Sequence, residues 1–316
     1  MADSPAAEHR PSESDVRALL RAVAPDLGEL PLRLVAEGWD NAIWRLGDDL
    51  AVRIPRRDAA APLIRHEQRA LPILGPWLAE HGILSPVPVV NGEPTSSFRW
   101  PWSVTPWIAG ERALGSPRGL NGAWAEDLAR ALRAIHRPAP DDAPPNLFRG
   151  NPLSTRDDVM QERLAQFPDR RALHDAWAAG LAAPLSAERV WIHGDVHPGN
   201  VVVQGGHLAA LIDFGDVTAG DPAYDLAAHW LLFDRAGRAA FRHATGDRYD
   251  GSTWTRARAW AAYLTLVFLT QSDDLPEYRE IGISTEAELA LPHRGDARPS
   301  RCAPSFNDRQ RRQAGR

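Results

Sequence analysis

The sequence predicts a two-lobed α+β protein with a small antiparallel sheet in its N-terminal lobe and a larger helical C-terminal lobe. Its 316 residues correspond to about two domains of ordinary size. Short strand-like runs dominate the first hundred residues, whereas apolar residues at helical spacing dominate after Gly110. We expect the lobes to span residues 14–106 and 107–290, flanked by a disordered N-terminus at 1–13 and a disordered basic tail at 291–316.

The N-terminal lobe is expected to begin with a short amphipathic helix. Four apolar residues from Val16 to Val23 lie at helical spacing, and Ser14 is the expected N-cap. Short polar turns separate the next three apolar runs, which predicts antiparallel hairpins. A helix at 66–81 contains Pro72 and Pro76, which we expect to bend or break it. The expected strands span residues 32–36, 42–46, 50–55, 86–90 and 98–107.

The C-terminal lobe combines many helical segments with a few short apolar strands. Trp124, Leu128, Leu132 and Ile135 share one face of a predicted helix. The expected helices span residues 120–136, 155–166, 169–181, 224–234, 238–244, 253–269 and 277–290. The expected strands span residues 189–193, 201–204 and 207–212.

Cysteine content and hydropathy favour a cytoplasmic protein. Cys302 is the one cysteine, so the chain forms no internal disulfide, as is usual in a reducing compartment. The polar N-terminus has no apolar segment typical of a signal peptide. The longest apolar run, at 259–270, is 12 residues long, too short to span a membrane.

The charge distribution argues against a nucleic-acid-binding protein. The net charge is −5, and the last 26 residues carry seven Arg and two Asp, which leaves −10 for the remainder. We therefore expect neither a nucleic-acid nor a membrane partner. All 36 basic residues are Arg, so any role that Lys usually fills must fall to Arg. The oligomeric state is left open.

Acidic and amide side chains gather around two short apolar strands. The apolar strand residues 190–192 lead into His193 and Asp195, Asn200 lies five residues after Asp195, and a hairpin returns the chain to Asp213. Carboxylate and amide oxygens suit Mg²⁺, which phosphate oxygens and water usually complete. A carboxylate left off the metal can accept a proton from a hydroxyl, a division of labour typical of kinases.

These motifs resemble the aminoglycoside phosphotransferase family, which comprises antibiotic kinases and related small-molecule kinases with a protein-kinase-like fold. The family's H-G-D-x-x-x-x-N loop is matched by 193–200, its I-D-[FWY]-G motif by 212–215, and its G-D-P-x-x-D-L-A motif by 220–227. The resemblance extends over about residues 16–290. It implies a bilobal kinase-like fold and transfer of a γ-phosphoryl group from ATP or GTP to a small hydroxylated acceptor, with Mg²⁺ as cofactor.

The resemblance also implies roles for individual residues of the C-terminal lobe. Asp195 would be the catalytic base, and Asn200 and Asp213 would bind Mg²⁺. Three further residues would brace the loop rather than take part in the chemistry: His193, Asp221 and Asp225.

In the N-terminal lobe the resemblance implies a nucleotide site. The turn at 37–42 would lie against the phosphates, and Arg53 occupies the position that is normally Lys. Arg binds phosphate bidentately and stays charged, so the exchange is chemically reasonable. Glu67 would orient Arg53, and the segment 102–107 would be the hinge beside adenine. The candidate nucleotide-binding residues are Arg53, Glu67, Asp40, Asn41, Thr105 and Trp107.

The acceptor is predicted to be aminoglycoside-like and to lie near the helices after Gly220. The family also includes kinases of macrolides, amino alcohols and sugars, so another hydroxylated metabolite remains the alternative. Two other functional classes stay open: a Zn²⁺-dependent hydrolase using His193, Asp195 and His197, and a nucleotide-binding pseudokinase. The candidate acceptor contacts are His197, Asp216, Trp230 and Asp234.

Overall fold

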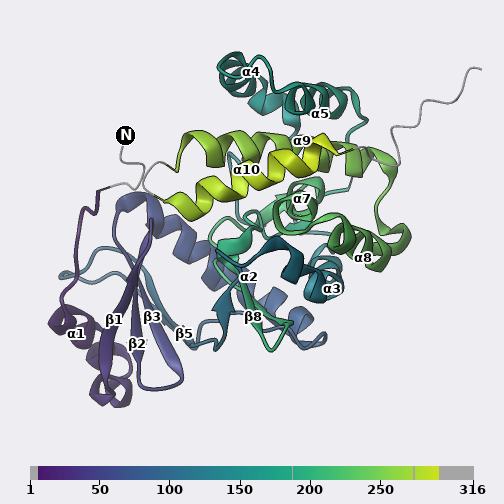
Figure 1. Ribbon diagram of the computed structural model, residues 1–316. Coiled ribbons are helices and arrows are strands. Elements are labelled where there is room, and N and C mark those ends of the chain that lie inside the picture. Colours follow the sequence, from purple (N-terminus) through teal and green to yellow (C-terminus); the bar gives the residue numbers. More distant parts are fainter. Residues whose placement is uncertain (1–5, 187, 273–274, 292–316) are drawn as a thin grey trace, which may run out of the picture.

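The computed structural model describes residues 6–186, 188–272 and 275–291 (Figure 1). A five-stranded antiparallel sheet forms the N-terminal part, and helices with a few short strands form the larger C-terminal part. Each part has its own hydrophobic core. The predicted α+β class, with a small sheet lobe and a larger helical lobe, is confirmed. None of the helices in the described ranges is long and apolar enough to cross a membrane.

The N-terminal sheet has the strand order β1-β2-β3-β5-β4. Helix α1 (Glu13–Val23) packs against it through Val16, Leu19 and Leu20, which are buried among apolar strand residues. The strands are β1 (Leu32–Glu37), β2 (Asn41–Leu46), β3 (Leu50–Pro55), β4 (Val90–Gly92) and β5 (Trp102–Pro106). The expected strand at 86–90 is therefore found two to four residues later, and the one at 98–107 is shorter.

The start of the chain differs from the expectation in two respects. The N-cap of α1 is Ser12, not Ser14, because the Ser12 hydroxyl accepts a hydrogen bond from the Asp15 amide while Asp15 accepts one from the Ser12 amide. Before the helix, the amides of Glu8 and His9 both donate to the Arg56 carbonyl, so this part of the segment expected to be disordered is hydrogen-bonded. Residues 1–5 and the basic tail from 292 lie outside the described residues.

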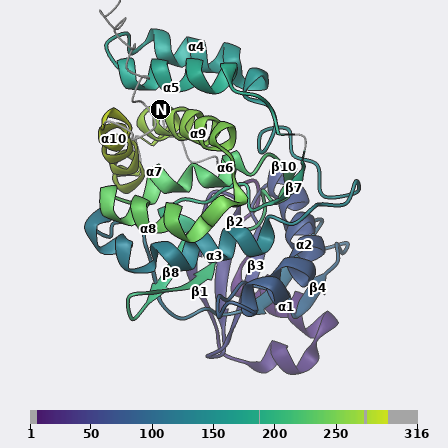
Figure 2. The same cartoon turned by 90° about the vertical axis from the view of Figure 1, so that its right-hand side faces the viewer.

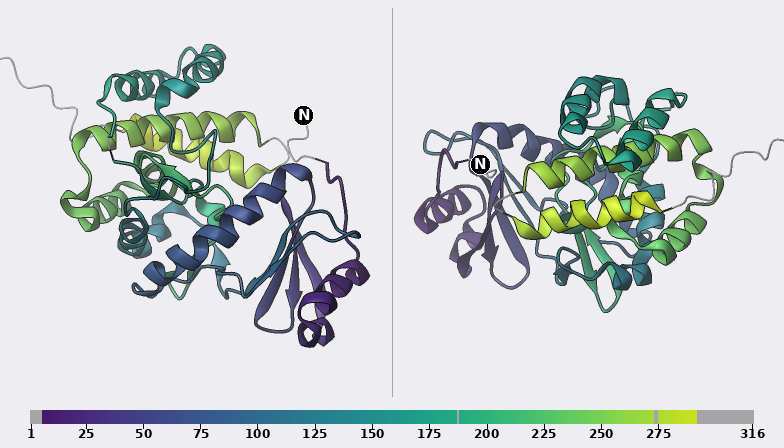
Figure 3. Two further views of the ribbon diagram at one scale, coloured as in Figure 1. Left: turned by 180° about the vertical axis from the view of Figure 1, so that it is seen from behind. Right: turned by 45° about the horizontal axis from the view of Figure 1, so that its top comes forward.

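Helix α2 (Ala61–Ala79) joins the two cores and is not broken at its prolines, where a bend or a break was expected. It runs continuously through Pro72 and Pro76. Its first half is tied to the sheet by a hydrogen bond from Gln68 Nε2 to the Trp102 carbonyl, 2.9 Å long. Its second half buries Leu71, Leu74 and Leu78 in the C-terminal core. Burial of these side chains offsets a cost of roughly 3 kcal/mol for each interior proline. Figure 3 shows α2 running from the sheet into the helical part.

The C-terminal part is built around a long central helix, α9 (Gly251–Thr270). Helices α5 and α10 both pack against α9, and α4 lies beside α5 at the edge of the molecule (Figure 2). The other helices are α3 (Ala125–Ile135), α4 (Asp157–Ala165), α5 (Arg171–Ala182), α6 (Ala223–Leu226), α7 (Ala228–Leu232), α8 (Arg235–Thr245) and α10 (Pro276–Ala290). The single helix expected at 224–234 is thus divided into α6 and α7.

Two small sheets lie among these helices and carry the motif residues. Strand β7 pairs with β10, and β8 pairs with β9 and β6. The strands are β6 (Glu111–Arg112), β7 (Val190–Ile192), β8 (Val201–Gln204), β9 (His207–Leu211) and β10 (Thr218–Gly220). Strand β7 ends at Ile192 and β9 at Leu211, and the residues that follow are in contact, since His193 Nε2 lies 3.0 Å from the Ile212 carbonyl.

Candidate active site

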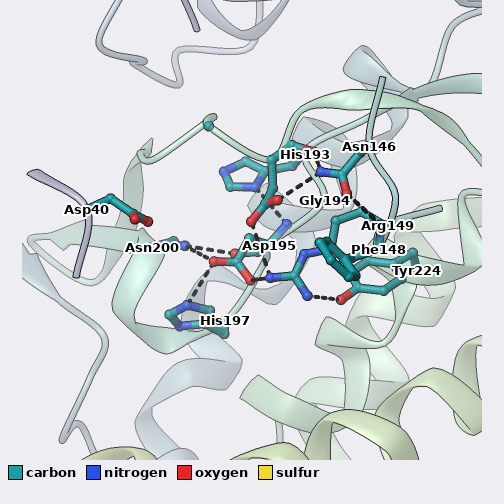
Figure 4. A network of polar contacts seen from close by, with 12 residues as sticks. Asp40, Asn146, Phe148, Arg149, His193, Gly194, Asp195, His197, Asn200 and Tyr224 are labelled. Carbon is teal, nitrogen blue, oxygen red and sulfur yellow. Dashed lines mark hydrogen bonds and ion pairs between the residues drawn. The ribbon is translucent and has the colours of Figure 1, made fainter. Parts of the chain in front are cut away.

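Asp195 lies at the centre of a network of polar contacts in the 193–200 loop (Figure 4). Its Oδ2 accepts from Asn200 Nδ2 at 3.0 Å and lies 3.3 Å from His197 Nε2, while Oδ1 accepts from Arg149 at 3.3 Å. Burial by itself would raise the pKa of Asp195, but His197 and Arg149 overcome this effect and hold that pKa well below its usual range. Asp195 is therefore an ionised, oriented carboxylate.

Asn200 and Asp213 are brought together by pairing between their neighbours. The Ile212 amide donates to the Asn200 carbonyl at 3.0 Å, so Asp213 follows directly after this contact. Asp213 is the one non-glycine residue with a positive φ, +65°, within the described ranges, and its side chain is 53% exposed. The side-chain NH₂ group of Asn200 donates to Asp195. The Oδ1 atom of Asn200 is therefore the atom that is left to act as a metal ligand. The carboxylate of Asp213 and the amide oxygen of Asn200 are both oxygen ligands of the kind that a hard cation such as Mg²⁺ prefers.

Arg53 and Glu67 form a buried ion pair that reaches Asp213. Arg53 Nη2 lies 3.1 Å from Glu67 Oε1 and 3.2 Å from Asp213 Oδ1, so it links β3, α2 and the 213 turn. Burial raises the pKa of Glu67 to about 7, although the charge of Arg53 opposes this rise. Arg53, which occupies the position that is usually Lys in the family, thus lies beside the candidate metal ligand Asp213.

The other candidate nucleotide-binding residues lie in or next to strands β2 and β5 of the N-terminal sheet. Asp40 accepts from Arg57 Nε at 2.9 Å, a partner that sequence analysis did not identify. Asn41 and Thr105 are buried within β2 and β5. The Trp107 amide donates to the Asp49 carbonyl at 2.7 Å, so this hinge amide is already occupied.

Of the three residues expected to brace the loop, Asp225 and His193 make contacts with its backbone, whereas Asp221 does not. Asp225 accepts from the amides of His193 and Gly194 at 2.7 and 2.9 Å and lies 3.1 Å from His136 Nε2. Gly194 has a φ of +82°, and a Cβ there would collide with the Asp216 carbonyl, so the turn before Asp195 requires glycine. Asp221 instead accepts a hydrogen bond from Arg256 Nε at 2.5 Å.

The zinc arrangement considered from the sequence is not assembled. His193 Nε2 lies 3.0 Å from the Ile212 carbonyl, and its Nδ1 accepts from the Asp195 amide at 3.2 Å, so both ring nitrogens are engaged. His197 Nδ1 accepts from the Gly199 amide. Across the part of the chain that the structure describes, no group of three or more His, Cys, Asp or Glu side chains is placed to hold a metal ion.

The four candidate acceptor contacts have different surroundings. His197 and Asp216 lie at the Asp195 network, where Asp216 Oδ2 accepts from Arg149 at 3.2 Å. Trp230 is buried in the helical core, so it does not face a ligand. Asp234 caps α8 through a 2.8 Å hydrogen bond from the Gly237 amide.

A cavity of about 530 Å³ opens beside the 193–200 loop. Pro198 lines one side, Leu231 and Leu232 of α7 line another, and Glu277 and Glu280 of α10 contribute carboxylates. Its volume is within the ~300–1,000 Å³ usual for small-molecule sites. It adjoins α7 and α10, in the region after Gly220 where we expected the acceptor.

Sequence analysis missed Arg149, Asn146 and His136. Arg149 and Asn146 contact the Asp195 network from a loop before α4, and His136 contacts Asp225 from the end of α3. No motif spacing marks these residues, because each reaches the site through tertiary packing. The turn residues Asn146 and Gly150 were the available signal that this loop has a defined conformation.

Comparison with known proteins identifies the family. The model of the phosphotransferase enzyme family APH matches residues 31–260. Among curated proteins, homoserine kinase of Bradyrhizobium sp. (strain ORS 278) is 34% identical over 171 residues, which cover 48% of this chain and 48% of that protein. The chain thus matches about half the length of this curated relative.

Solved structures share the fold at low sequence identity. The GDP and kanamycin complex of APH(2")-IIia has a TM-score of 0.66 and 17% identity, covering 87% of this chain and 97% of that one. Macrolide 2'-phosphotransferase MphH from Brachybacterium faecium has a TM-score of 0.58 and 21% identity, covering 87% and 99%. Since the family model matches residues 31–260, a range that spans most of the chain and includes Asp195, Asn200 and Asp213, this protein belongs to the phosphotransferase enzyme family APH.

Proposed function

We propose that this protein is an ATP- and Mg²⁺-dependent O-phosphotransferase that moves the γ-phosphoryl group to a hydroxyl of a small molecule. The observation that carries the proposal is the convergence of Asp195, Asn200 and Asp213 with the Arg53–Glu67 pair, which comes from the N-terminal sheet and α2. We take residues 14–106 and 107–290 as the two lobes between which the nucleotide binds.

The nucleotide side of the site has the charges that the reaction needs. Asn200 Oδ1 and the exposed carboxylate of Asp213 would hold Mg²⁺, and Arg53 would pair with phosphate oxygens. When bound, Mg²⁺ would supply positive charge that offsets the negative charge developing on the phosphate during transfer. Glu67 keeps the guanidinium of Arg53 in place from the protein side.

Asp195 is the group best placed to act as base. As the acceptor oxygen forms its bond to the γ-phosphorus, its proton passes to Asp195 and the bond from phosphorus to the bridging oxygen breaks. The nucleoside diphosphate leaves with that electron pair. Most of the rate gain in such transfers comes from positioning and charge neutralisation, which is consistent with an Asp195 carboxylate held by three side chains.

For the acceptor we propose a hydroxylated, cationic molecule of the aminoglycoside type. The cavity next to Pro198 supports this choice, because Glu277 and Glu280 line it. Among the described residues that line it, the one cation is Arg118, which is already bonded to the Trp230 carbonyl and to Ser284. The carboxylates are thus available to ammonium groups.

A second candidate acceptor is homoserine, an amino acid with a side-chain hydroxyl, or another small molecule that carries both an amino group and a hydroxyl. The 34% identity to a homoserine kinase supports it, although that match covers about half of either protein. An acceptor of this size would occupy only part of the cavity.

A panel of acceptors distinguishes these possibilities. Purified protein with Mg·ATP is tested with aminoglycosides, macrolides, homoserine, other amino alcohols and sugars, following ADP release and mass gain of the acceptor. We expect an aminoglycoside to be phosphorylated, with acceptor KM only moderately salt-dependent, since exposed charge contacts contribute ~0–1 kcal/mol each. Turnover of homoserine or macrolides alone would contradict the aminoglycoside choice. Nucleotide binding without any transfer would indicate a pseudokinase, and hydrolysis restored by Zn²⁺ alone would indicate a hydrolase.

A further inference from the structure

Arg149 connects the candidate base to a second carboxylate. Its Nη2 donates to Asp195 Oδ1 at 3.3 Å and to Asp216 Oδ2 at 3.2 Å, while Nη1 donates to the Tyr224 hydroxyl at 2.6 Å (Figure 4). The guanidinium also lies over the Tyr224 ring. One cation thus separates two carboxylates that would otherwise repel each other beside the phosphate site.

The loop that carries Arg149 is fixed by its own hydrogen bonds. Asn146 Oδ1 accepts from the amides of Phe148 and Arg149 at 2.8 and 3.1 Å, and its Nδ2 donates to Asp216 Oδ1 at 2.8 Å. Gly150 has a φ of +65°, and a Cβ there would come within 2.6 Å of Ile192 Cδ1. The guanidinium is therefore held in place before any ligand binds.

The contacts of Asp195 distinguish its two oxygens. Oδ2 is contacted by both Asn200 and His197, whereas among the described residues the contact recorded at Oδ1 is the one from Arg149. A carboxylate oxygen offers about two acceptor positions. Oδ1 therefore keeps a position for the acceptor hydroxyl, and Arg149 determines where that position points.

We propose that Arg149 is a positioning residue that holds Asp195 with Oδ1 directed to the acceptor hydroxyl. This inference rests on the proposed phosphotransferase function. Arg149 acts on the acceptor side, whereas Arg53 acts on the nucleotide side. Its loss should therefore reduce kcat and leave nucleotide binding largely unchanged.

The kinetic test compares Arg149→Ala and Arg149→Lys with wild type, and uses Arg69→Ala as a matched control at an exposed arginine. We expect kcat of Arg149→Ala to fall by about 10- to 100-fold, the size of effect that misplacing a reacting group produces. The KM for ATP should stay within about twofold. Arg149→Lys should recover part of the loss, and guanidinium ion should partly restore Arg149→Ala.

Several outcomes would overturn the proposal. One is a kcat of Arg149→Ala within about twofold of wild type. Another is a raised KM for ATP in Arg149→Ala with an unchanged kcat. If Arg149→Ala does not fold, Arg149→Lys and Tyr224→Phe decide, because both keep most of the buried volume. Each should lower kcat without raising the KM for ATP, and wild-type kcat in both would count against the proposal.

A structural measurement separates this inference from the proposed function. In a crystal structure of Arg149→Lys, we expect the Asp195 carboxylate to rotate away from its wild-type orientation. An unchanged orientation would refute the role of Arg149 even if turnover were altered. If wild type transfers no phosphoryl group to any acceptor, the proposed function fails, and the orientation of Asp195 still decides on Arg149.

Discussion

Replacing Asp225 with asparagine should destabilise the protein strongly, although the two side chains have nearly the same shape. Asp225 is fully buried, and its Oδ2 accepts from the His193 amide and from His136 while Oδ1 accepts from the Gly194 amide. An asparagine best keeps its oxygen at the Oδ2 position, which places its NH₂ group against the Gly194 amide. The buried Gly194 amide then loses its acceptor. The two hydrogen bonds at the Oδ2 position, from the His193 amide and from His136, lose their charged acceptor.

These changes have known magnitudes. An orphaned buried donor costs about 1–3 kcal/mol, and a bond to a neutral acceptor is weaker than one to a charged acceptor by ~1 kcal/mol. Asp225→Asn should therefore lower the free energy of unfolding by about 3–5 kcal/mol, a large share of the ~5–15 kcal/mol typical of a folded protein. Because the two amides belong to the turn that carries Asp195, kcat should fall as well.

Urea denaturation followed by tryptophan fluorescence measures this loss. Asp141→Asn is the matched control, since Asp141 is exposed and should change the free energy of unfolding by less than about 0.5 kcal/mol. A loss below about 1 kcal/mol in Asp225→Asn would refute the reasoning. It would mean that the turn at Gly194 keeps its conformation without the carboxylate.

Substitutions at four further positions test other parts of the site and the fold. Asp195→Asn should keep the fold and nucleotide binding but lower turnover by ~10²–10⁴-fold, since an amide cannot accept the proton; a rate above roughly a third of wild type would contradict this role. Asp213→Ala should weaken Mg·ATP binding, measured by titration, and an unchanged Mg²⁺ dependence would argue against it as a ligand. Arg53→Ala should raise the KM for ATP, with Arg53→Lys partly tolerated; unchanged kinetics would exclude Arg53 from phosphate binding. Asp250→Ala should lower the free energy of unfolding by about 0.5–2 kcal/mol, because Asp250 caps α9. Hydrogen bonds from Thr253 lower the pKa of Asp250, so this stabilisation should be present above pH 3.8 and be lost as the pH falls below it, as urea denaturation at several pH values would measure.

Sequence analysis predicted the elements whose signals are local. The three hairpin strands lie within one residue of the expected bounds, since alternating apolar residues and short polar turns are read from immediate neighbours. The motif at 193–200 was recognised for the same reason, and its strand ends bring Asn200 next to Asp213. The expected bounds of α2 were wrong, and the single helix expected at 224–234 is two helices, α6 and α7. In both places packing outweighs local propensity.

The residues, their order and their charges were thus determined by the sequence alone: a loop with Asp195 and Asn200, a turn with Asp213, and Arg53 in a chain without lysine. Only the tertiary structure decided which of these groups meet. Arg53 reaches Asp213 across 160 residues, and Arg149 reaches Asp195 across 46 residues from a loop without a motif. Contacts of this kind depend on how α2 and the strand cluster pack, and no pattern among sequence neighbours encodes that packing.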